Sequence, residues 1–243
     1  MQTLYLVKSL VLLGCRVSVL CYFEYDDLVV DEYRMAGSSV VVMNLDRKLD
    51  AIAFIRTIRK AILDFKADVV HVQYMTPGAL AVISARLSGV PRVYATVHQP
   101  FSSWHNLIWK YLLRFSSVLC DHFISVSLRT EKSWFGSVSS IENCKKKLPK
   151  HFTIHNAVDV SLVESIVQSE EALILKEKYA ERDTFVFGFI GRLSYEKGLD
   201  ILLMAFKELV ARHKNIRLVV VGSGPEHSSL LPKIGRASCR ERV

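Results

Sequence analysis

A glycine and two cations follow an apolar run near the carboxyl end of the sequence. Gly191 and Arg192 stand directly after residues 185–190, and Lys197 follows five positions later. A guanidinium offers a planar pair of donors to phosphate oxygens, and a lysine ammonium adds a mobile point charge. Glycine lets the backbone turn or lets a ligand approach closely. This pattern predicts a diphosphate-binding loop, although two solvent-exposed cations in an ordinary loop would give it too.

The residues on either side predict how this loop is held. The run 185–190 is almost wholly apolar, as a strand covered on both faces should be. Residues 199–213 have the apolar spacing of a helix, whose positive end should face the loop. A second apolar run, 217–221, leads into the turn Gly222-Ser223-Gly224-Pro225. Open α/β sheets bind ligands at the carboxyl edge, where strands such as these two end.

The first two thirds of the chain alternate short apolar runs with helical patterns. Residues 4–13 predict an amphipathic core helix that ends at Gly14. Predicted strands follow at 17–22, 40–43, 69–72, 93–97, 123–126 and 152–154, with helices at 52–65, 79–87 and 104–115. Alternation of this kind gives a parallel sheet with right-handed crossovers. The predicted fold class is therefore α/β.

The pattern changes after Asp159, which divides the chain into regions. Residues 1–160 form a first α/β domain, 161–183 a charged helical connector, and 184–233 the start of a second domain. The last ten residues, 234–243, read IGRASCRERV and look like the translation of a sequencing-adapter oligonucleotide. A genuine basic tail is the alternative. We expect the natural protein to continue past Lys233.

Composition limits the classes of partner. The chain has 243 residues, half of them hydrophobic, which argues against disorder, and its net charge of +8 favours phosphates or anionic surfaces. No motif of aromatic residues interleaved with basic ones points to nucleic acid. No run of about 18 uninterrupted apolar residues predicts a spanning helix. Residues 137–150, which include Lys145, Lys146, Lys147 and Lys150, predict a solvated basic loop.

Nothing in the sequence predicts a metal site. The five cysteines have the spacing of neither a zinc site nor a disulfide framework, and reduced, mostly buried thiols are expected. No Asp-x-Asp pair is present, and the adjacent Asp26 and Asp27 are interpreted as part of a solvated loop. We therefore expect no metal and no other cofactor.

Two segments of the second domain together resemble a family signature. Residues 191–206 read GRLSYEKGLDILLMAF, and residues 217–226 read RLVVVGSGPE; both resemble the GT4 family of glycosyltransferases. DVVHVQY at 68–74, ATVH at 95–98, ISVS at 124–127 and HNAVD at 155–159 resemble its first domain more loosely. The resemblance implies the GT-B architecture, in which two Rossmann-like domains face a cleft. It also implies transfer of a sugar, of hexosyltransferase type, from a nucleotide-diphosphate sugar with retained anomeric configuration.

The resemblance also implies roles for particular residues. Arg192 and Lys197 would bind the donor diphosphate, with Gly191, and offset charge growing on the leaving nucleotide. Gly222 and Gly224 would border the donor site with their backbone. His98, counted with Arg192 and Lys197 as catalytic, would lie near the donor sugar.

Other implications concern what surrounds that site. His71 lies inside a predicted strand, where a buried structural histidine is favoured over a ligand. The family's first strand would precede Met1, and its Glu-x7-Glu segment would follow Lys233. Because both segments are missing from the sequence given, we expect this fragment to be inactive.

The acceptor remains open among glycans, lipids and small molecules. A cytoplasmic location is expected, with peripheral contact at the cytosolic face of a membrane as a further expectation. Such contact would use an interfacial surface, although a buried sheet-covering helix is favoured for the same residues. That surface would comprise Trp104, Trp109, Tyr111, Leu112, Leu113 and Phe115, with Lys110 and Arg114.

Three other functions remain as alternatives. The turn from Gly222 to His227 begins like the GxGxxG of a dinucleotide-binding oxidoreductase, although His227 occupies the last glycine position. An epimerase or phosphorylase, which would keep the same architecture but catalyse a different reaction, is the second alternative. A non-catalytic protein that keeps the GT-B fold is the third.

Overall fold

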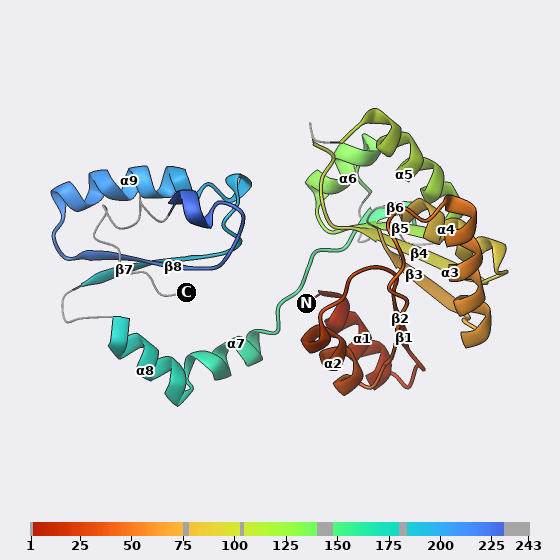
Figure 1. The fold of residues 1–243 in the computed structure, drawn as a ribbon, viewed down its shortest axis with the longest axis horizontal. Helices are drawn as coiled ribbons and strands as arrows, with labels where there is room; N and C mark the ends of the chain where they lie inside the picture. The colour runs from red at the N-terminus through yellow and green to blue at the C-terminus, as the bar shows by residue number, and fades with distance from the viewer. Residues whose placement is uncertain (1, 75–77, 103–104, 140–147, 180–183, 231–243) are drawn as a thin grey trace. The chain divides into compact units, whose positions relative to one another are not determined.

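The computed structural model describes residues 2–74, 78–102, 105–139, 148–179 and 184–230. The predictions for Trp104, for Lys145 to Lys147 and for the tail at 234–243 lie outside these residues. The chain divides into two compact units, Met1–Val158 and Asp159–Val243 (Figure 1).

Unit 1 is an α/β unit in which every strand pairing is parallel. Strands β1 (Ser18–Cys21) and β2 (Ser39–Val42) form one pair. Strands β3 (Val69–Gln73), β4 (Arg92–Val97), β5 (His122–Ser125) and β6 (His151–Thr153) form a sheet in sequence order. The helices are α1 (Gln2–Leu12), α2 (Asp27–Met35), α3 (Ala51–Phe65), α4 (Gly78–Leu87), α5 (Leu107–Leu119) and α6 (Leu128–Phe135).

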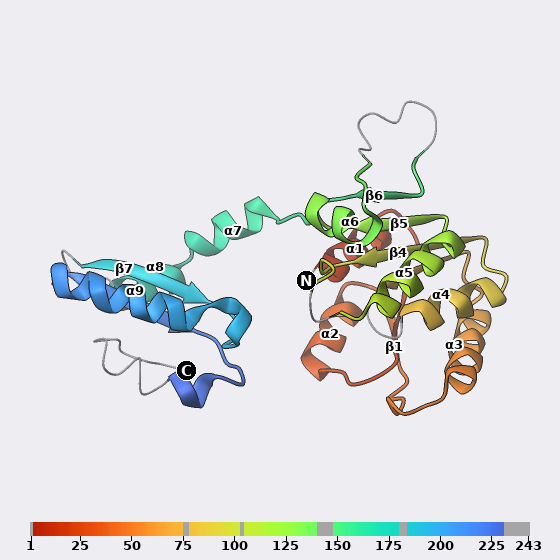
Figure 2. The same ribbon diagram turned by 90° about the horizontal axis from the view of Figure 1, so that it is seen from above.

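The core of unit 1 lies between its larger sheet and a row of helices. The crossovers between successive strands place α4, α5 and α6 on one face of that sheet, and α3 packs beside α4 (Figure 2). Phe54, Ile58 and Ile62 recur along one face of α3 and are buried in this core. Asp50 caps α3 by accepting from the backbone N–H groups of Ile52 and Ala53, each at 2.9 Å.

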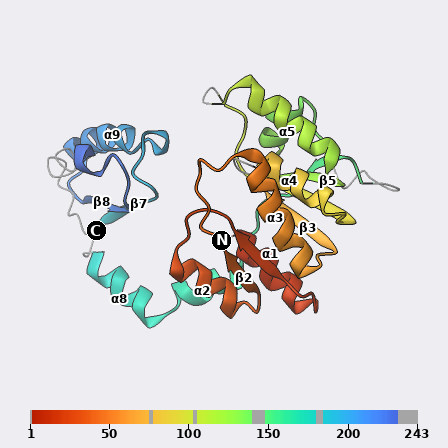
Figure 3. The same ribbon diagram turned by 45° about the vertical axis from the view of Figure 1, so that its right-hand side comes forward.

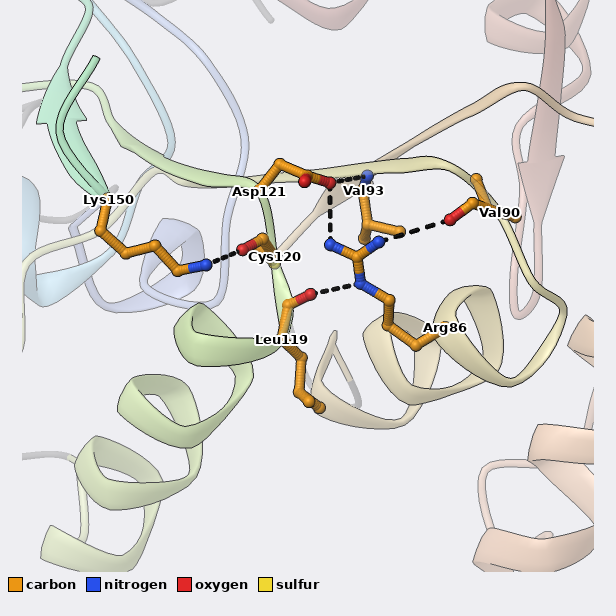
Figure 4. Close-up of polar contacts among 7 residues, drawn as sticks. All are labelled: Arg86, Val90, Val93, Leu119, Cys120, Asp121 and Lys150. Atoms are coloured by element: carbon orange, nitrogen blue, oxygen red, sulfur yellow. Dashed lines mark hydrogen bonds and ion pairs between the residues drawn. The ribbon is translucent and has the colours of Figure 1, made fainter. Parts of the chain in front are cut away.

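Polar contacts connect elements at the amino edge of the larger sheet (Figure 4). The guanidinium of Arg86 donates to the carbonyls of Leu119 and Val90 and to Asp121 Oδ2, the last at 2.8 Å. Asp121 Oδ2 also accepts from Val93 N at 2.7 Å. Burial alone would raise the pKa of Asp121, but these hydrogen bonds outweigh it and lower the pKa. The group therefore joins α4, β4 and the start of β5.

Three sequence-based expectations for unit 1 were wrong. Asp26 and Asp27 do not lie in a loop: Asp26 caps α2 by accepting from Leu28 N at 2.9 Å, and Asp27 is its first residue. The predicted single sheet is two sheets, since β1 and β3 are not paired. The helix predicted at 104–115 starts at Leu107, because Asn106 caps it, and it continues to Leu119. Helix α6, capped by Ser127, was not predicted.

Unit 2 contains a smaller core. Helices α7 (Val160–Val167) and α8 (Glu170–Tyr179) occupy the predicted connector. Strands β7 (Phe185–Ile190) and β8 (Ile216–Val221) pair in parallel, and α9 (Leu199–Arg212) covers one face of the pair (Figure 3). Leu199, Leu203 and Phe206 on α9 are buried with Leu218 of β8. The strand–helix–strand prediction for this segment is confirmed.

The chain's cysteines and helices bear on two further expectations. Within the described residues the thiols are free, but only Cys120 is buried; Cys15 is exposed and Cys21 half-buried, so the expectation of mostly buried thiols was wrong for these two. None of the helices in the described ranges combines the length and apolar character needed to cross a bilayer.

Candidate functional site

Two loops meet at the carboxyl ends of β7 and β8. Gly191 and Arg192 directly follow β7, and residues 222–225 directly follow β8. Together they border an open cavity of about 730 Å³, lined by Ile190, Gly191, Arg192, Val221, Gly222, Ser223, Gly224 and Pro225. Four predicted site residues, Gly191, Arg192, Gly222 and Gly224, are therefore brought together at the edge where open α/β sheets bind ligands.

Backbone hydrogen bonds hold the two loops against each other. Gly191 N donates to Val221 O at 3.0 Å, and Leu193 N donates to Ser223 O at 2.8 Å. Leu193 O in turn accepts from Glu226 N at 3.1 Å. These contacts fix the cavity wall with main-chain atoms, so its shape depends little on side-chain rotamers.

The glycines differ in why they are needed. Gly222 has a φ of 148°, and a Cβ there would lie 1.8 Å from Gly191 O. A Cβ at Gly224 would lie 2.3 Å from Leu193 O. Both glycines are thus required by loop-on-loop packing. A Cβ at Gly191 would meet only the ring of Phe189 at 3.7 Å, so the protein itself does not demand glycine there, and close ligand approach stays the prediction.

The two cations occupy different parts of the β7–α9 connection. Arg192 is exposed and lines the cavity, while the next two residues, Leu193 and Ser194, are buried and anchor the loop. Lys197 is exposed at the end of the short helix η1 (Tyr195–Lys197), outside the cavity lining. Within the described ranges, neither cation forms a salt bridge. Both charges are therefore available to an anionic ligand.

The start of α9 lies next to these cations. Gly198, with a φ of 66°, ends η1 and caps α9, and no side chain caps the first turn of the helix. Two acids flank this point: Asp200, in the first turn of α9, and Glu196, whose carboxylate accepts from Ser194 Oγ at 2.7 Å. The bond from Ser194, followed by one from its own backbone, lowers the pKa of Glu196. The predicted placement of a positive helix end after Lys197 is confirmed.

Two histidines lie toward the carboxyl ends of β3 and β4 in unit 1. His98 follows β4 directly, and its Nε2 lies 2.8 Å from Gln73 Oε1, at the end of β3. The amide oxygen accepts this hydrogen bond and fixes the orientation of the ring. Burial lowers the pKa of His98, which favours the neutral ring. Its predicted role stays a prediction.

His71 lies inside β3, opposite Tyr94 of β4. Its Nε2 lies 2.7 Å from Thr96 Oγ1 on β4, at hydrogen-bond distance. Burial, and then the charge of His98, lower the pKa of His71 to about 4. These contacts agree with the structural role favoured from the sequence.

The pKa of His71 predicts how stability depends on pH. The unfolded chain binds a proton on this ring near pH 6.5 and the folded chain only near pH 4, so protonation favours unfolding. The free energy of unfolding should fall by up to about 3 kcal/mol as pH drops from 6.5 to 4. Urea unfolding across this range should show a shallower decline for His71→Asn, which cannot titrate but can still bond Thr96. Parallel declines would contradict the prediction.

Acidic and metal-ligating side chains do not gather in the parts of the chain that the structure describes. No group of three or more His, Cys, Asp or Glu side chains there could hold a metal ion. The cavity lining itself contains no carboxylate.

Comparison with known proteins gives the family. The sequence model of Glycosyltransferase Family 4 matches residues 1–162, and that of Glycosyl transferases group 1 matches residues 170–242. The first match covers more than half of the chain. The chain belongs to glycosyltransferase family 4. The predicted family is thereby confirmed.

Relatives of this family-4 chain are similar over parts of their length. The alpha-monoglucosyldiacylglycerol synthase of Acholeplasma laidlawii is 25% identical over 194 residues, which are 71% of this chain and 45% of that protein. The capsular polysaccharide biosynthesis glycosyltransferase CapM of Staphylococcus aureus is 38% identical over 58 residues, 23% of this chain and 15% of CapM. The chain thus spans less than half of either relative.

Solved structures establish the fold of this family-4 chain. Anabaena Alr3699/HepE, crystallised with UDP and glucose, matches with a TM-score of 0.69 at 16% identity, over 97% of this chain and 62% of that one. A glycosyltransferase from Rickettsia africae matches with the same TM-score at 17% identity, over 98% of this chain and 62% of its own. The fold is GT-B, with parallel sheets, as predicted.

The sequence did not identify every part of the cavity wall. Ile190, Val221, Ser223 and Pro225 also line it. Ile190 and Val221 are the last residues of β7 and β8. They could have been predicted as part of the site, because open α/β sheets bind ligands at the ends of their strands. The contact between Gly222 and Gly191 O had no signal in the sequence, because it depends on the register between β7 and β8.

Proposed function

We propose that the full-length protein transfers a sugar from a nucleotide-diphosphate sugar to an acceptor, with retention of configuration. The observation that carries this proposal is the cavity at the carboxyl ends of β7 and β8, bordered by glycine backbone and by Arg192. Backbone that lacks side chains permits close approach of a diphosphate, and a guanidinium matches its oxygens. The match to glycosyltransferase family models supports the same reaction class.

The proposed reaction requires a site that stabilises negative charge on the leaving group. The bond between the sugar's anomeric carbon and the diphosphate oxygen breaks, the acceptor oxygen bonds to that carbon, and the acceptor proton is lost. The nucleotide diphosphate leaves with its additional negative charge. Arg192 and Lys197, together with the uncapped start of α9, would oppose that charge. Gly191, Gly222 and Gly224 would bind the donor through their backbone.

We infer no resident metal or cofactor for this reaction, because the cations supply the charge that a metal would. His98, held by Gln73, remains a proposed catalytic contact to the donor sugar. The acceptor is left open among glycans, lipids and small molecules. Relatives differ in this respect, since their names indicate a glycolipid in Acholeplasma laidlawii and a capsular polysaccharide in Staphylococcus aureus. We also propose that the full-length protein is cytosolic and makes peripheral contact with a membrane.

A panel of donors tests the proposal. Full-length protein would be offered UDP-, GDP- and ADP-sugars, with binding followed by calorimetry and cleavage by release of the nucleotide diphosphate. We expect at least one donor to bind and turn over, and the product anomer, read by NMR, to match that of the donor. An inverted product would contradict retention alone. Binding without turnover would favour the non-catalytic alternative, and binding of NAD or NADP with no sugar donor would favour the oxidoreductase.

A further inference from the structure

Helix α5 exposes the apolar side of its cylinder. Five apolar side chains form a stripe along it, which we call the α5 stripe: Leu107 (61% exposed), Ile108 (68%), Tyr111 (66%), Phe115 (55%) and Val118 (70%). They recur at three- and four-residue steps and so share one face of the helix. A contiguous exposed apolar face of this kind marks a site of interaction.

The opposite face of α5 already makes the contacts that the core requires. Leu113, Ser116 and Ser117 are buried there, and Ser116 Oγ donates to Leu112 O at 2.8 Å and lies 3.2 Å from Tyr74 Oη. Leu113, which the predicted interfacial surface included, is buried and is not part of the stripe, whereas Ile108 and Val118, which that surface left out, are exposed on it. The stripe is thus not needed to seat the helix on its sheet.

Most charges near the stripe are positive, and the acid that follows α5, Asp121, is paired with Arg86 at 2.8 Å. Residues 98–120 contain no Asp or Glu. Lys110 and Arg114 lie one turn apart beside the stripe on the side that faces α6, where Arg114 Nε donates to Trp134 O at 2.8 Å. Helix α6 packs against α5 and exposes Arg129 and Lys132, while its only acid, Glu131, is fully buried. An apolar stripe bordered by cations complements an anionic lipid surface.

We propose that the α5 stripe, with the cations beside it, binds the surface of a membrane that contains anionic lipids. Phe115, Val118 and their neighbours would enter the boundary between headgroups and acyl chains, and Lys110, Arg129 and Lys132 would meet the headgroup phosphates. A second copy of the chain fits this face less well. Two such faces brought together would oppose four cations with four, and like charges across an interface repel.

Vesicle flotation of the full chain tests the proposal without requiring any transfer activity, so its failure is distinct from failure of the proposed reaction. Vesicles would contain phosphatidylcholine alone or phosphatidylcholine with phosphatidylglycerol. We expect the chain to float with the anionic vesicles. The double variant Tyr111→Ser/Phe115→Ser should lower the partition coefficient by more than about tenfold. The matched control Leu28→Ser/Met35→Ser, on α2, exposes equally apolar residues (78% and 80%) beside acids and should bind as wild type.

Charge removal gives a second readout. Arg129→Gln and Lys132→Gln should each weaken binding to anionic vesicles by about fivefold and leave binding to neutral vesicles unchanged. All these side chains are exposed, so urea unfolding of each variant should match wild type. Equal flotation of wild type and Tyr111→Ser/Phe115→Ser would overturn the proposal. So would a concentration-dependent dimer that this variant abolishes while wild type fails to bind vesicles.

Discussion

Replacing Lys197 by alanine in the full-length protein is expected to lower sugar transfer by about two to three orders of magnitude. Loss of a single group that stabilises charge in the transition state has an effect of this size in other enzymes. Lys197 is exposed and its neighbour Gly198 begins α9, so removal of the ammonium leaves the fold in place but takes a positive charge from the proposed diphosphate site. The turnover number and the Michaelis constant for the donor would be measured together.

Lys207→Ala is the matched control for that measurement. Lys207 is also an exposed lysine of unit 2, within α9, but it lies well beyond the first turn of that helix. Its removal changes the net charge by the same amount and should leave turnover unchanged. Lys197→Arg should recover part of the lost rate, since it restores a cation with different geometry. Near-normal turnover of Lys197→Ala would remove this residue from the proposed mechanism.

Much of the fold could be predicted because periodicity in the sequence reports burial. Each described strand lies within about two residues of an apolar run, since parallel strands covered on both faces need continuous apolar residues. Helix α2 escaped prediction because its sequence, DLVVDEYRM, is charged and buries only Val30. Asp26 and Asp27 were interpreted as a solvated pair, whereas aspartate is also among the residues preferred at a helix N-cap.

The separation of unit 1 into two sheets has a different cause. Pairing of β1 with β3 is a long-range property that no local pattern specifies, and the structure pairs β1 only with β2. Helix α5 shows the same limit. Apolar periodicity identified the helix, but it could not tell which of its two sides faces the core: Leu113 is buried as the sheet-covering alternative expects, whereas Tyr111 and Phe115 are exposed.

The residue types of the candidate site could be predicted from the sequence, but the backbone packing that shapes the site could not. Gly191 and Arg192 follow a strand, and strand ends bind ligands, so their place at the cavity could be anticipated. The need for glycine at position 222 could not, because it arises from a backbone atom 31 residues earlier in the chain that only the register of β7 and β8 brings near. This difference leads to a test that separates packing from ligand approach.

Gly222→Ala is expected to destabilise unit 2 by about 3 kcal/mol in the absence of any ligand. A Cβ at this position would lie 1.8 Å from Gly191 O, and the φ of 148° is one that side chains rarely adopt. Because the obstructing atom is a backbone carbonyl, relief requires the loops after β7 and β8 to separate. That movement would break the bonds from Gly191 N to Val221 O and from Leu193 N to Ser223 O. Urea unfolding would measure the loss as a lower midpoint.

Gly188→Ala is the control for Gly222→Ala, because a Cβ at Gly188 meets no atom within 4 Å and φ there is not positive. This change lies in β7 of the same unit and should leave the unfolding midpoint near that of wild type. If glycine at position 222 served only to leave room for the donor, Gly222→Ala would unfold like wild type and would lose only donor binding. The two outcomes differ in urea unfolding measured without donor. The role of Gly222 in packing the cavity wall can therefore be tested before the ligand is known.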